Sequence, residues 1–513
     1  MENLRIMAWI FLAAFLGFLL YVGVWAGKKN KTGTTGAEVE YFLGGKSTPL
    51  IVLAMSYAAS AVSAGSFIGD PGMMSTIGWP YFWLVIGVVP GLVLPGYIII
   101  RRMRVQAEKY GSLTLTEYLG DRYRSPFLKY YLTVVITICF IFMLVSQFKG
   151  AAALLEMYTG IPFKVGLVIM LAVVIFYVNT GGLRSVAWTD FFQGCFMTVM
   201  CVMMVVVAIY KVGGMNSLEA TLADKWPEAL RITEAGPTQA DGTVVGWLGV
   251  LSLITWGCTL MFCAPHITAR YLALPTVHKT DVAKFSMISM VTGFLFNLMF
   301  ICGLCGRVIF PDAEADYMTV TMSSTLLPPF FACVCMIGFF SAIVSTATSI
   351  LLVIGQSIGR DLYGGLAKNS TPEKEVRVTQ VATVVVSLIV FGFNMIQPPA
   401  FLQIFIYIGL SGIGSAIFMP LYAGVMCKRS TKLAAIVSAI VGPAMYVIWT
   451  VPLGYSFASG MGVAPFAAFV AFVVVAWVEN MVKGPDQPMI DWADGFKDVP
   501  KNDPYLAKKR MFN

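Results

Sequence analysis

The chain is poor in charged residues and in histidine. Only 12% of its 513 residues are Asp, Glu, Lys or Arg, 58% are hydrophobic, and His266 and His278 are the only histidines. Soluble globular proteins carry about a quarter charged residues, so this composition excludes that class. Two scattered histidines supply no cluster of nucleophile, base or metal ligands, which argues against an enzyme. We therefore expect no catalytic residue and no cofactor.

Cysteine gives no convincing metal site either. Cys302 and Cys305 have the spacing of a metal-binding pair, but they lie within an apolar run. With so few histidines to complete a ligand set, we interpret them as small interior residues. A zinc or redox site is therefore not expected.

Instead, the sequence contains many apolar runs long enough to cross a membrane. A hydrocarbon layer of ~30 Å needs about 20 helical residues. Runs of that length predict an all-α polytopic membrane protein with about thirteen transmembrane helices. The predicted spans are 6–24, 50–76, 81–100, 127–157, 162–178, 185–210, 247–271, 285–305, 329–358, 378–395, 401–425, 433–449 and 464–482. Because the first run lacks a small-residue cleavage site, we expect it to be retained.

The basic residues indicate an orientation. Lys and Arg gather in the loops that follow the odd-numbered spans, and short basic loops stay in the cytoplasm. We predict a multi-pass protein of the bacterial inner (plasma) membrane with its N-terminus outside and its C-terminus in the cytoplasm. Contact with anionic membrane lipid accounts for the net charge of +8. No nucleic acid and no obligate protein partner are inferred.

Two polar segments within predicted spans indicate where a cation could bind. Residues 58–66, AASAVSAGS, are small, and a membrane helix can break there and free its carbonyls. The ninth span contains four hydroxyls in five residues, Ser345, Thr346, Thr348 and Ser349. Such oxygens without carboxylates suit a monovalent alkali cation better than Ca²⁺. The alternatives are close helix packing and bonding of each hydroxyl to its own helix.

Asp190 and Lys149 are charged residues within apolar spans, where a charge is costly and usually functional. Asp190 lies in the segment GGLRSVAWTDFFQ at 181–193, and its alternatives are a helix cap or an ion pair with Arg184. Lys149 is predicted ~16 Å below the outer end of its span. One interpretation is that Lys149 forms an ion pair with Asp70, since Glu156 lies too far from Lys149 along the helix to be its partner. The other interpretation is that Lys149 attracts a carboxylate of the substrate.

The segments 181–193 and 341–349, SAIVSTATS, resemble the signature of the solute:sodium symporter family, and the resemblance runs from YFLG at 41–44 to RDLY at 360–363. It implies a LeuT-like core of five plus five helices in an inverted repeat. The implied division is 1–48, first helix and cytoplasmic loop; 49–212, first repeat (spans 2–6); 213–246, extracellular loop; 247–427, second repeat (spans 7–11); 428–482, peripheral spans 12–13; and 483–513, cytoplasmic tail.

The resemblance also implies the ion and substrate sites. The principal sodium would be held by backbone carbonyls and hydroxyls of five residues: Ala59, Val62, Ala342, Ser345 and Thr346. A second sodium, bound by some members, would lie at Asp190, Ser345, Thr348 and Ser349. We assign the substrate to Ser63, Ser66, Lys149 and Trp256.

Short segments such as SFIGDPG at 66–72 and GRVIFPD at 306–312 look most like the sodium/pantothenate branch, and Ala61 stands where the proline branch would have an aspartate. Asp70 and Lys149 depart from the pantothenate pattern. We predict a sodium-coupled secondary active symporter that imports a small organic solute, a carboxylate such as pantothenate, by alternating access. A proline-like amino acid or a sugar is the alternative solute. A membrane sensor built on a symporter fold is the alternative of another class, although the tail after Lys483 is short for an output domain.

Overall fold

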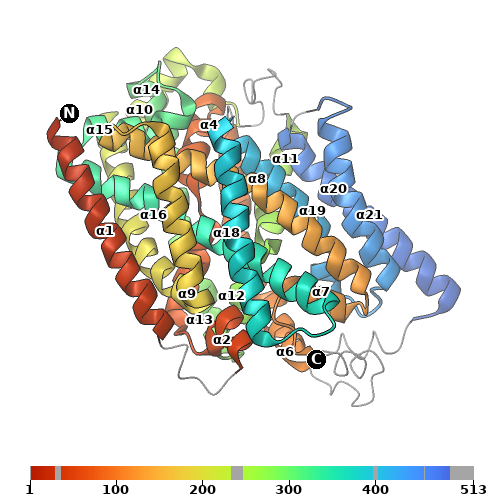
Figure 1. The fold of residues 1–513 in the computed structure, drawn as a ribbon. Helices are drawn as coiled ribbons and strands as arrows, with labels where there is room; N and C mark the ends of the chain where they lie inside the picture. The colour runs from red at the N-terminus through yellow and green to blue at the C-terminus, as the bar shows by residue number, and fades with distance from the viewer. Residues whose placement is uncertain (1, 29–35, 233–245, 397–401, 456, 486–513) are drawn as a thin grey trace.

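The computed structural model describes residues 2–28, 36–232, 246–396, 402–455 and 457–485. Residues 233–245 of the predicted extracellular loop, most of the cytoplasmic tail, and Lys29 and Lys31 of the first basic loop lie outside these residues. The described residues form helices without a strand. The long helices lie side by side in one bundle (Figure 1).

Ten helices of the described residues are long and apolar enough to cross a membrane, and two bent pairs raise the number to twelve. The fifth predicted span, 162–178, is a shorter apolar helix, Phe163–Asn179, which is the first part of α9. The long helices are α1 (Glu2–Lys28), α5 (Trp83–Pro95) leading into α6 (Arg101–Tyr110), α8 (Pro126–Thr159), α9 (Phe163–Lys211), α13 (Lys279–Asn297) leading into α14 (Met299–Ile309), α16 (Pro329–Gln356), α18 (Pro372–Ile396), α19 (Leu402–Met426), α20 (Lys432–Thr450) and α21 (Phe457–Lys483).

Two helices are broken within the bundle. The segment Leu50–Ala61 (α3) and the segment Gly65–Ile77, which ends with α4 (Asp70–Ile77), differ in direction by 59°. The segment Trp247–Cys263, which begins with α11 (Trp247–Thr255), and α12 (Pro265–Leu272) differ by 51°. A π-helical turn lies near each break, and Pro265 favours the second break because proline keeps the residue before it out of the helical conformation. These pairs are the first spans of the two predicted repeats.

A sharp corner divides α9 at the glycine pair of the 181–193 segment. Gly182 has φ +61°, a conformation that glycine adopts without a steric penalty. A side chain at Gly182 would also collide with the backbone carbonyl of Tyr41 in α2 (Ala37–Leu43). The two glycines therefore separate the fifth and sixth predicted spans and let α2 pack against the corner.

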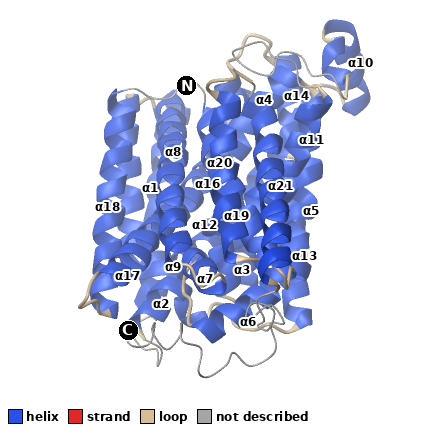
Figure 2. Cartoon of the chain, turned by 90° about the vertical axis from the view of Figure 1, so that its right-hand side faces the viewer, coloured by secondary structure: helices blue, strands red, loops and turns tan. Residues whose placement is uncertain are grey.

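Short helices lie at both ends of the bundle (Figure 2). α2, α6, α7 (Leu115–Arg122) and α17 (Gly364–Leu366) lie at one end, which the basic loops predict to be cytoplasmic, while α10 (Met215–Lys225) and α15 (Met318–Leu326) lie at the other. At the first end Arg360 forms ion pairs with Glu38, Glu117 and Glu375 at 3.0, 3.3 and 2.8 Å. Burial raises the pKa of Glu38 above its ordinary value, although the Arg360 guanidinium opposes this shift. This cluster joins α2, α7 and α18.

α16 runs through the middle of the bundle and is buried along its apolar length. It packs against α1, α3, α8 and α9. Its hydroxyl segment therefore lies in the interior and meets the break between α3 and α4.

Candidate functional site

The break between α3 and α4 leaves backbone oxygens without helical partners inside the protein. α3 ends at Ala61, and Val62 is extended, with φ −107° and ψ 150°. The last carbonyls of a helix have no N–H donor from a following turn, and they carry the negative end of the helix dipole. Ser63 begins the second half, where its Oγ accepts a hydrogen bond of 3.0 Å from the N–H of Gly65.

Two hydroxyls of α16 reach these carbonyls. Ser345 Oγ lies 3.0 Å from the carbonyl oxygen of Ala59 and 3.1 Å from that of Ala342. Thr346 donates a hydrogen bond to the carbonyl oxygen of Val62. The structure thus brings together all five residues assigned to the principal sodium site, although Ala59 and Ser345 are 286 positions apart in the chain.

These five oxygens form a buried cluster without charge, which we call the hydroxyl cluster. The residues Ser345 and Thr346 are 0% and 1% exposed. Hydroxyl and carbonyl oxygens are hard ligands, and together they can replace the water around a small cation. Each hydroxyl group can rotate about its C–O bond so that its proton points away from the cluster. The hydroxyl and carbonyl oxygens that now share hydrogen bonds could then coordinate one ion together.

The residues assigned to a second sodium are brought together only in part. Asp190 Oδ2 accepts hydrogen bonds from Ser56 at 2.7 Å and Ser60 at 3.2 Å, and it forms an ion pair with Arg270 at 2.9 Å. Ser349 Oγ accepts a hydrogen bond from Arg270 at 2.7 Å. We call these five residues the Asp190 cluster.

Thr348 does not join the Asp190 cluster. Its hydroxyl contacts the carbonyl oxygens of Val344 and Ser345 in its own helix at 2.9 and 3.1 Å, a common arrangement for membrane helices. The suggestion that Asp190 pairs with Arg184 is also wrong, because its cation is Arg270 of α12. Arg184 is six residues away on the same helix, and a rotation of about 100° per residue directs the two side chains to different faces.

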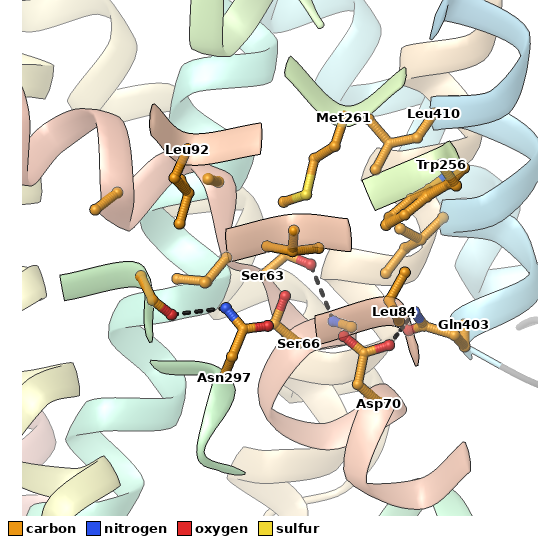
Figure 3. A pocket seen from close by; sticks show the side chains of 17 residues that line it. Ser63, Ser66, Asp70, Leu84, Leu92, Trp256, Met261, Asn297, Gln403 and Leu410 are labelled. Atoms are coloured by element: carbon orange, nitrogen blue, oxygen red, sulfur yellow. Dashed lines mark hydrogen bonds between the residues drawn. The ribbon is translucent and has the colours of Figure 1, made fainter. Parts of the chain in front are cut away.

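A narrow cavity with about 30 Å³ of free space lies beside the break. Three of the four residues assigned to the substrate, Ser63, Ser66 and Trp256, line it. In Figure 3, Asp70 and Gln403 lie next to each other, and Trp256 and Met261 are on the opposite side. This volume is far below the ~300–1,000 Å³ of pockets that hold small molecules, so a solute can enter only if the elements that line the cavity move apart.

Lys149 does not line this cavity. Its Nζ forms an ion pair of 2.7 Å with Asp316 Oδ2, and the two side chains are 11% and 10% exposed. Asp316 lies just before α15, at the end of the bundle predicted to be extracellular. The structure corrects the expectations that Lys149 faces Ser63 and Ser66 or pairs with Asp70. The sequence indicated its depth in the membrane but not which way it points around the axis of α8.

Several residues of the cavity were not assigned to the substrate from the sequence. Asp70 was considered only as a partner for Lys149, yet its Oδ1 accepts hydrogen bonds from Tyr81 at 2.6 Å and from Gln403 at 2.7 Å. A carboxylate within the broken span was a usable signal for Asp70. Gln403 had no local signal, because its role depends on how α19 packs beside the break.

No group of three or more His, Cys, Asp or Glu side chains in the described ranges could hold a metal ion. Cys302 and Cys305 are buried, free cysteines in α14.

The structure is similar to those of cation-coupled symporters. A Na⁺-coupled sialic acid symporter, solved in a substrate-bound outward-open state, has a TM-score of 0.76 at 19% identity, covering 92% of this chain and 97% of that one. A transporter of the nucleobase-cation-symport-1 family has a TM-score of 0.52 at 14% identity, covering 88% and 98%. These similarities identify the fold as LeuT-like.

Relatives by sequence include a high-affinity proline transporter of Bacillus subtilis, 28% identical, covering 94% of this chain and 99% of that one. The sodium/pantothenate symporter of Escherichia coli is also 28% identical, covering 85% and 89%. Equal identities give no preference for the pantothenate branch. The model of the sodium:solute symporter family matches residues 41–442. The chain belongs to the sodium:solute symporter family and is a multi-pass membrane transporter, not an enzyme.

Proposed function

We propose that this symporter imports a small organic solute with Na⁺ by alternating access, and that both bind at the break between α3 and α4. The observation that carries the proposal is the double role of Val62. Its carbonyl oxygen accepts the hydrogen bond from Thr346, and Val62 also lines the cavity. An ion in the hydroxyl cluster would fix the conformation of the break, and the break forms one wall of the cavity.

In this proposal the principal sodium binds to the hydroxyl cluster. A second sodium would bind in the Asp190 cluster, where Asp190 Oδ1 is buried and accepts no hydrogen bond from the described residues. Binding there with the predicted ligands requires Thr348 to leave the carbonyls of its own helix. It also places the ion near the guanidinium of Arg270.

The proposed solute is small and organic, and its class depends on the cavity. The expectation of a carboxylate such as pantothenate relied on Lys149, whose charge is matched by Asp316. Among the described residues that line the cavity, none is Lys, Arg or His. A proline-like amino acid keeps a carboxylate but adds a positive nitrogen, and a sugar carries neither charge. The cavity therefore favours the amino-acid alternative over a simple carboxylate.

The proposal places the protein in a bacterial plasma membrane, with the α10 end of the bundle outside. The basic loops support this orientation. It also retains the division into two five-helix repeats at 49–212 and 247–427, because the two broken pairs each begin one of them. A sensor on the same fold would bind its solute without accumulating it.

The test is uptake by purified protein in proteoliposomes, with a panel of amino acids, carboxylates and sugars. We expect saturable uptake of at least one solute under an inward Na⁺ gradient and none under a matched K⁺ gradient. Ala61 lines the cavity, so Ala61→Leu should abolish uptake, whereas Ala14→Leu on the exposed face of α1 should not. Equal uptake in Na⁺ and K⁺ would rule out sodium coupling, and full activity of Ala61→Leu would rule out this cavity.

A further inference from the structure

Asp70 is a buried carboxylate on the wall of the cavity. Its residue surface is 6% exposed. Tyr81 and Gln403 both donate to Oδ1, at 2.6 and 2.7 Å. Oδ2 accepts no hydrogen bond from the described residues. One oxygen is therefore held in place by the protein and the other is available on the same carboxylate.

No positive charge of the described residues accompanies Asp70. It takes part in no ion pair there, and it is the only charged residue among those that line the cavity. The segments 233–245 and 397–401, outside the described residues, contain no Lys, Arg or His. A carboxylate within a membrane bundle is costly without a cation, and such residues usually mark a pathway or a binding site. Two other charged residues within the bundle provide a contrast, since Lys149 forms an ion pair with Asp316 and Asp190 forms one with Arg270.

Two more polar atoms around the cavity have no hydrogen-bond partner among the described residues. Gln403 Oε1 is a buried acceptor, and it belongs to the same side chain that donates to Asp70. Trp256 Nε1 is a buried donor on the other side of the cavity. Unsatisfied buried polar groups are rare in proteins, and each one needs an explanation. A solute with an N–H donor at one end and an acceptor oxygen at the other would satisfy both.

We propose that Asp70 binds a positively charged nitrogen of the transported solute, so that the substrate is a small zwitterion or organic cation and not a simple carboxylate. This inference rests on the proposed function, because it assumes that the cavity holds the transported solute. The nitrogen lies at Asp70 Oδ2, with Gln403 Oε1 as a second acceptor. An oxygen of the solute accepts the N–H of Trp256.

The test compares solutes that differ only in the charged nitrogen. The pairs are L-proline with tetrahydrofuran-2-carboxylate, glycine betaine with 3,3-dimethylbutyrate, and choline with 3,3-dimethylbutanol. Thermal stabilisation of the purified full-length protein, with and without Na⁺, reports binding, and proteoliposomes report uptake. We expect at least one nitrogen-bearing member to bind, and its partner without the charged nitrogen to bind at least about tenfold more weakly.

The variant Asp70→Asn removes the charge and keeps an oxygen that can accept from Tyr81 and Gln403. We expect it to weaken binding of the nitrogen-bearing solute by ~10- to 100-fold, since hydrogen bonds to charged groups are the stronger ones. Asp312→Asn is the control, because Asp312 is exposed near the end of the bundle predicted to be extracellular. It should leave binding unchanged.

The proposal is overturned if no nitrogen-bearing member binds, if paired solutes bind equally, or if Asp70→Asn binds like the wild type. A rise in the sodium requirement of Asp70→Asn with unchanged solute affinity would also overturn it, and would make Asp70 an ion ligand. Sodium-driven uptake confined to sugars, or to carboxylates that carry no charged nitrogen, would also overturn this inference but would leave the proposed symport intact. Binding of a cation through Asp70 without sodium-dependent uptake of any solute would instead reject the symport.

Discussion

The hydroxyl cluster and the Asp190 cluster both involve α16, but they differ in how their charges are arranged. The hydroxyl cluster contains only neutral oxygens, and its hydrogen bonds join side chains to backbone carbonyls. The Asp190 cluster contains a carboxylate and a guanidinium 2.9 Å apart, both fully buried. The hydroxyl cluster presents the negative ends of oxygen dipoles and contains no positive charge. The Asp190 cluster already contains the positive charge of the Arg270 guanidinium.

This difference shows why a carboxylate does not by itself identify a cation site. A sodium ion at the hydroxyl cluster would meet only oxygen dipoles, including those at the end of α3. A sodium ion beside Asp190 would be attracted by the carboxylate and repelled by Arg270, and both interactions are strong away from water. Five single-residue variants test this comparison.

The largest effect is expected from Arg270→Met, which leaves Asp190 with only the hydroxyls of Ser56 and Ser60. Removing one partner of a buried ion pair costs about 3–5 kcal/mol. We expect a large fall in the melting temperature of the purified protein and partial recovery in the double variant Arg270→Met with Asp190→Asn. Thermal unfolding in detergent measures both.

The control for this experiment is Lys284→Met. Lys284 is 69% exposed and lies 3.9 Å from Asp281, and exposed pairs contribute little to stability. If Arg270→Met is no less stable than Lys284→Met, the guanidinium of Arg270 does not compensate the negative charge of Asp190. If Na⁺ but not K⁺ restores the melting temperature of Arg270→Met, the Asp190 cluster can hold sodium once the guanidinium is gone.

The next effect is expected at the hydroxyl cluster. Thr346→Val keeps the shape and removes one oxygen ligand, as Ser345→Ala does at the neighbouring position. Each loss should cost ~1.5–3 kcal/mol, which raises the sodium concentration for half-maximal uptake by roughly ten- to a hundredfold. In the control Thr137→Val, the lost hydroxyl bonds only to Thr133 of its own helix. An unchanged sodium requirement in both cluster variants would reject this site.

A smaller effect on stability is expected for Lys149→Met, which leaves Asp316 without its cation. The loss should be about 1–3 kcal/mol, because unpaired buried polar groups cost that much and this pair is slightly exposed. Adding Asp316→Asn should restore much of the melting temperature. Lys164→Met, an exposed lysine near the same end, serves as the control. A tenfold loss of solute affinity at normal stability would return Lys149 to the substrate site.

The smallest effect is expected for Thr348→Val, because its hydroxyl bonds to its own helix. The sodium requirement and the sodium Hill coefficient should stay within about twofold of the wild type. A fall of the Hill coefficient from above one to one, measured from uptake at varied Na⁺, would show that Thr348 turns towards a second ion during the cycle.

The sequence predicted the parts of the structure that depend on local patterns. Apolar length predicted the spans, and the run of small residues before Gly65 predicted the break in the second span. The hydroxyls of Ser345 and Thr346 predicted one side of the hydroxyl cluster, and the resemblance supplied the facing carbonyls of Ala59 and Val62. These features are either local or shared across the family.

The partners of the charged residues were not predicted. Asp190 pairs with Arg270 and Lys149 with Asp316, across 80 and 167 positions of the chain. A sequence shows that such a charge needs a partner but not which helix supplies it, because that depends on how helices rotate against one another. The cluster around Arg360 was missed for the same reason, since its basic residue looked like one more loop charge.

The double role of Val62 has a thermodynamic consequence. If sodium binding at its carbonyl tightens solute binding in the cavity by some factor, solute binding must tighten sodium binding by the same factor, because the two routes to the fully loaded state have equal free energy. The factor can therefore be measured from either side, by titrating Na⁺ with and without solute or the reverse. A substitution that loosens the backbone at Val62, such as Val62→Gly, should reduce both effects together, while the uncoupled affinities change less.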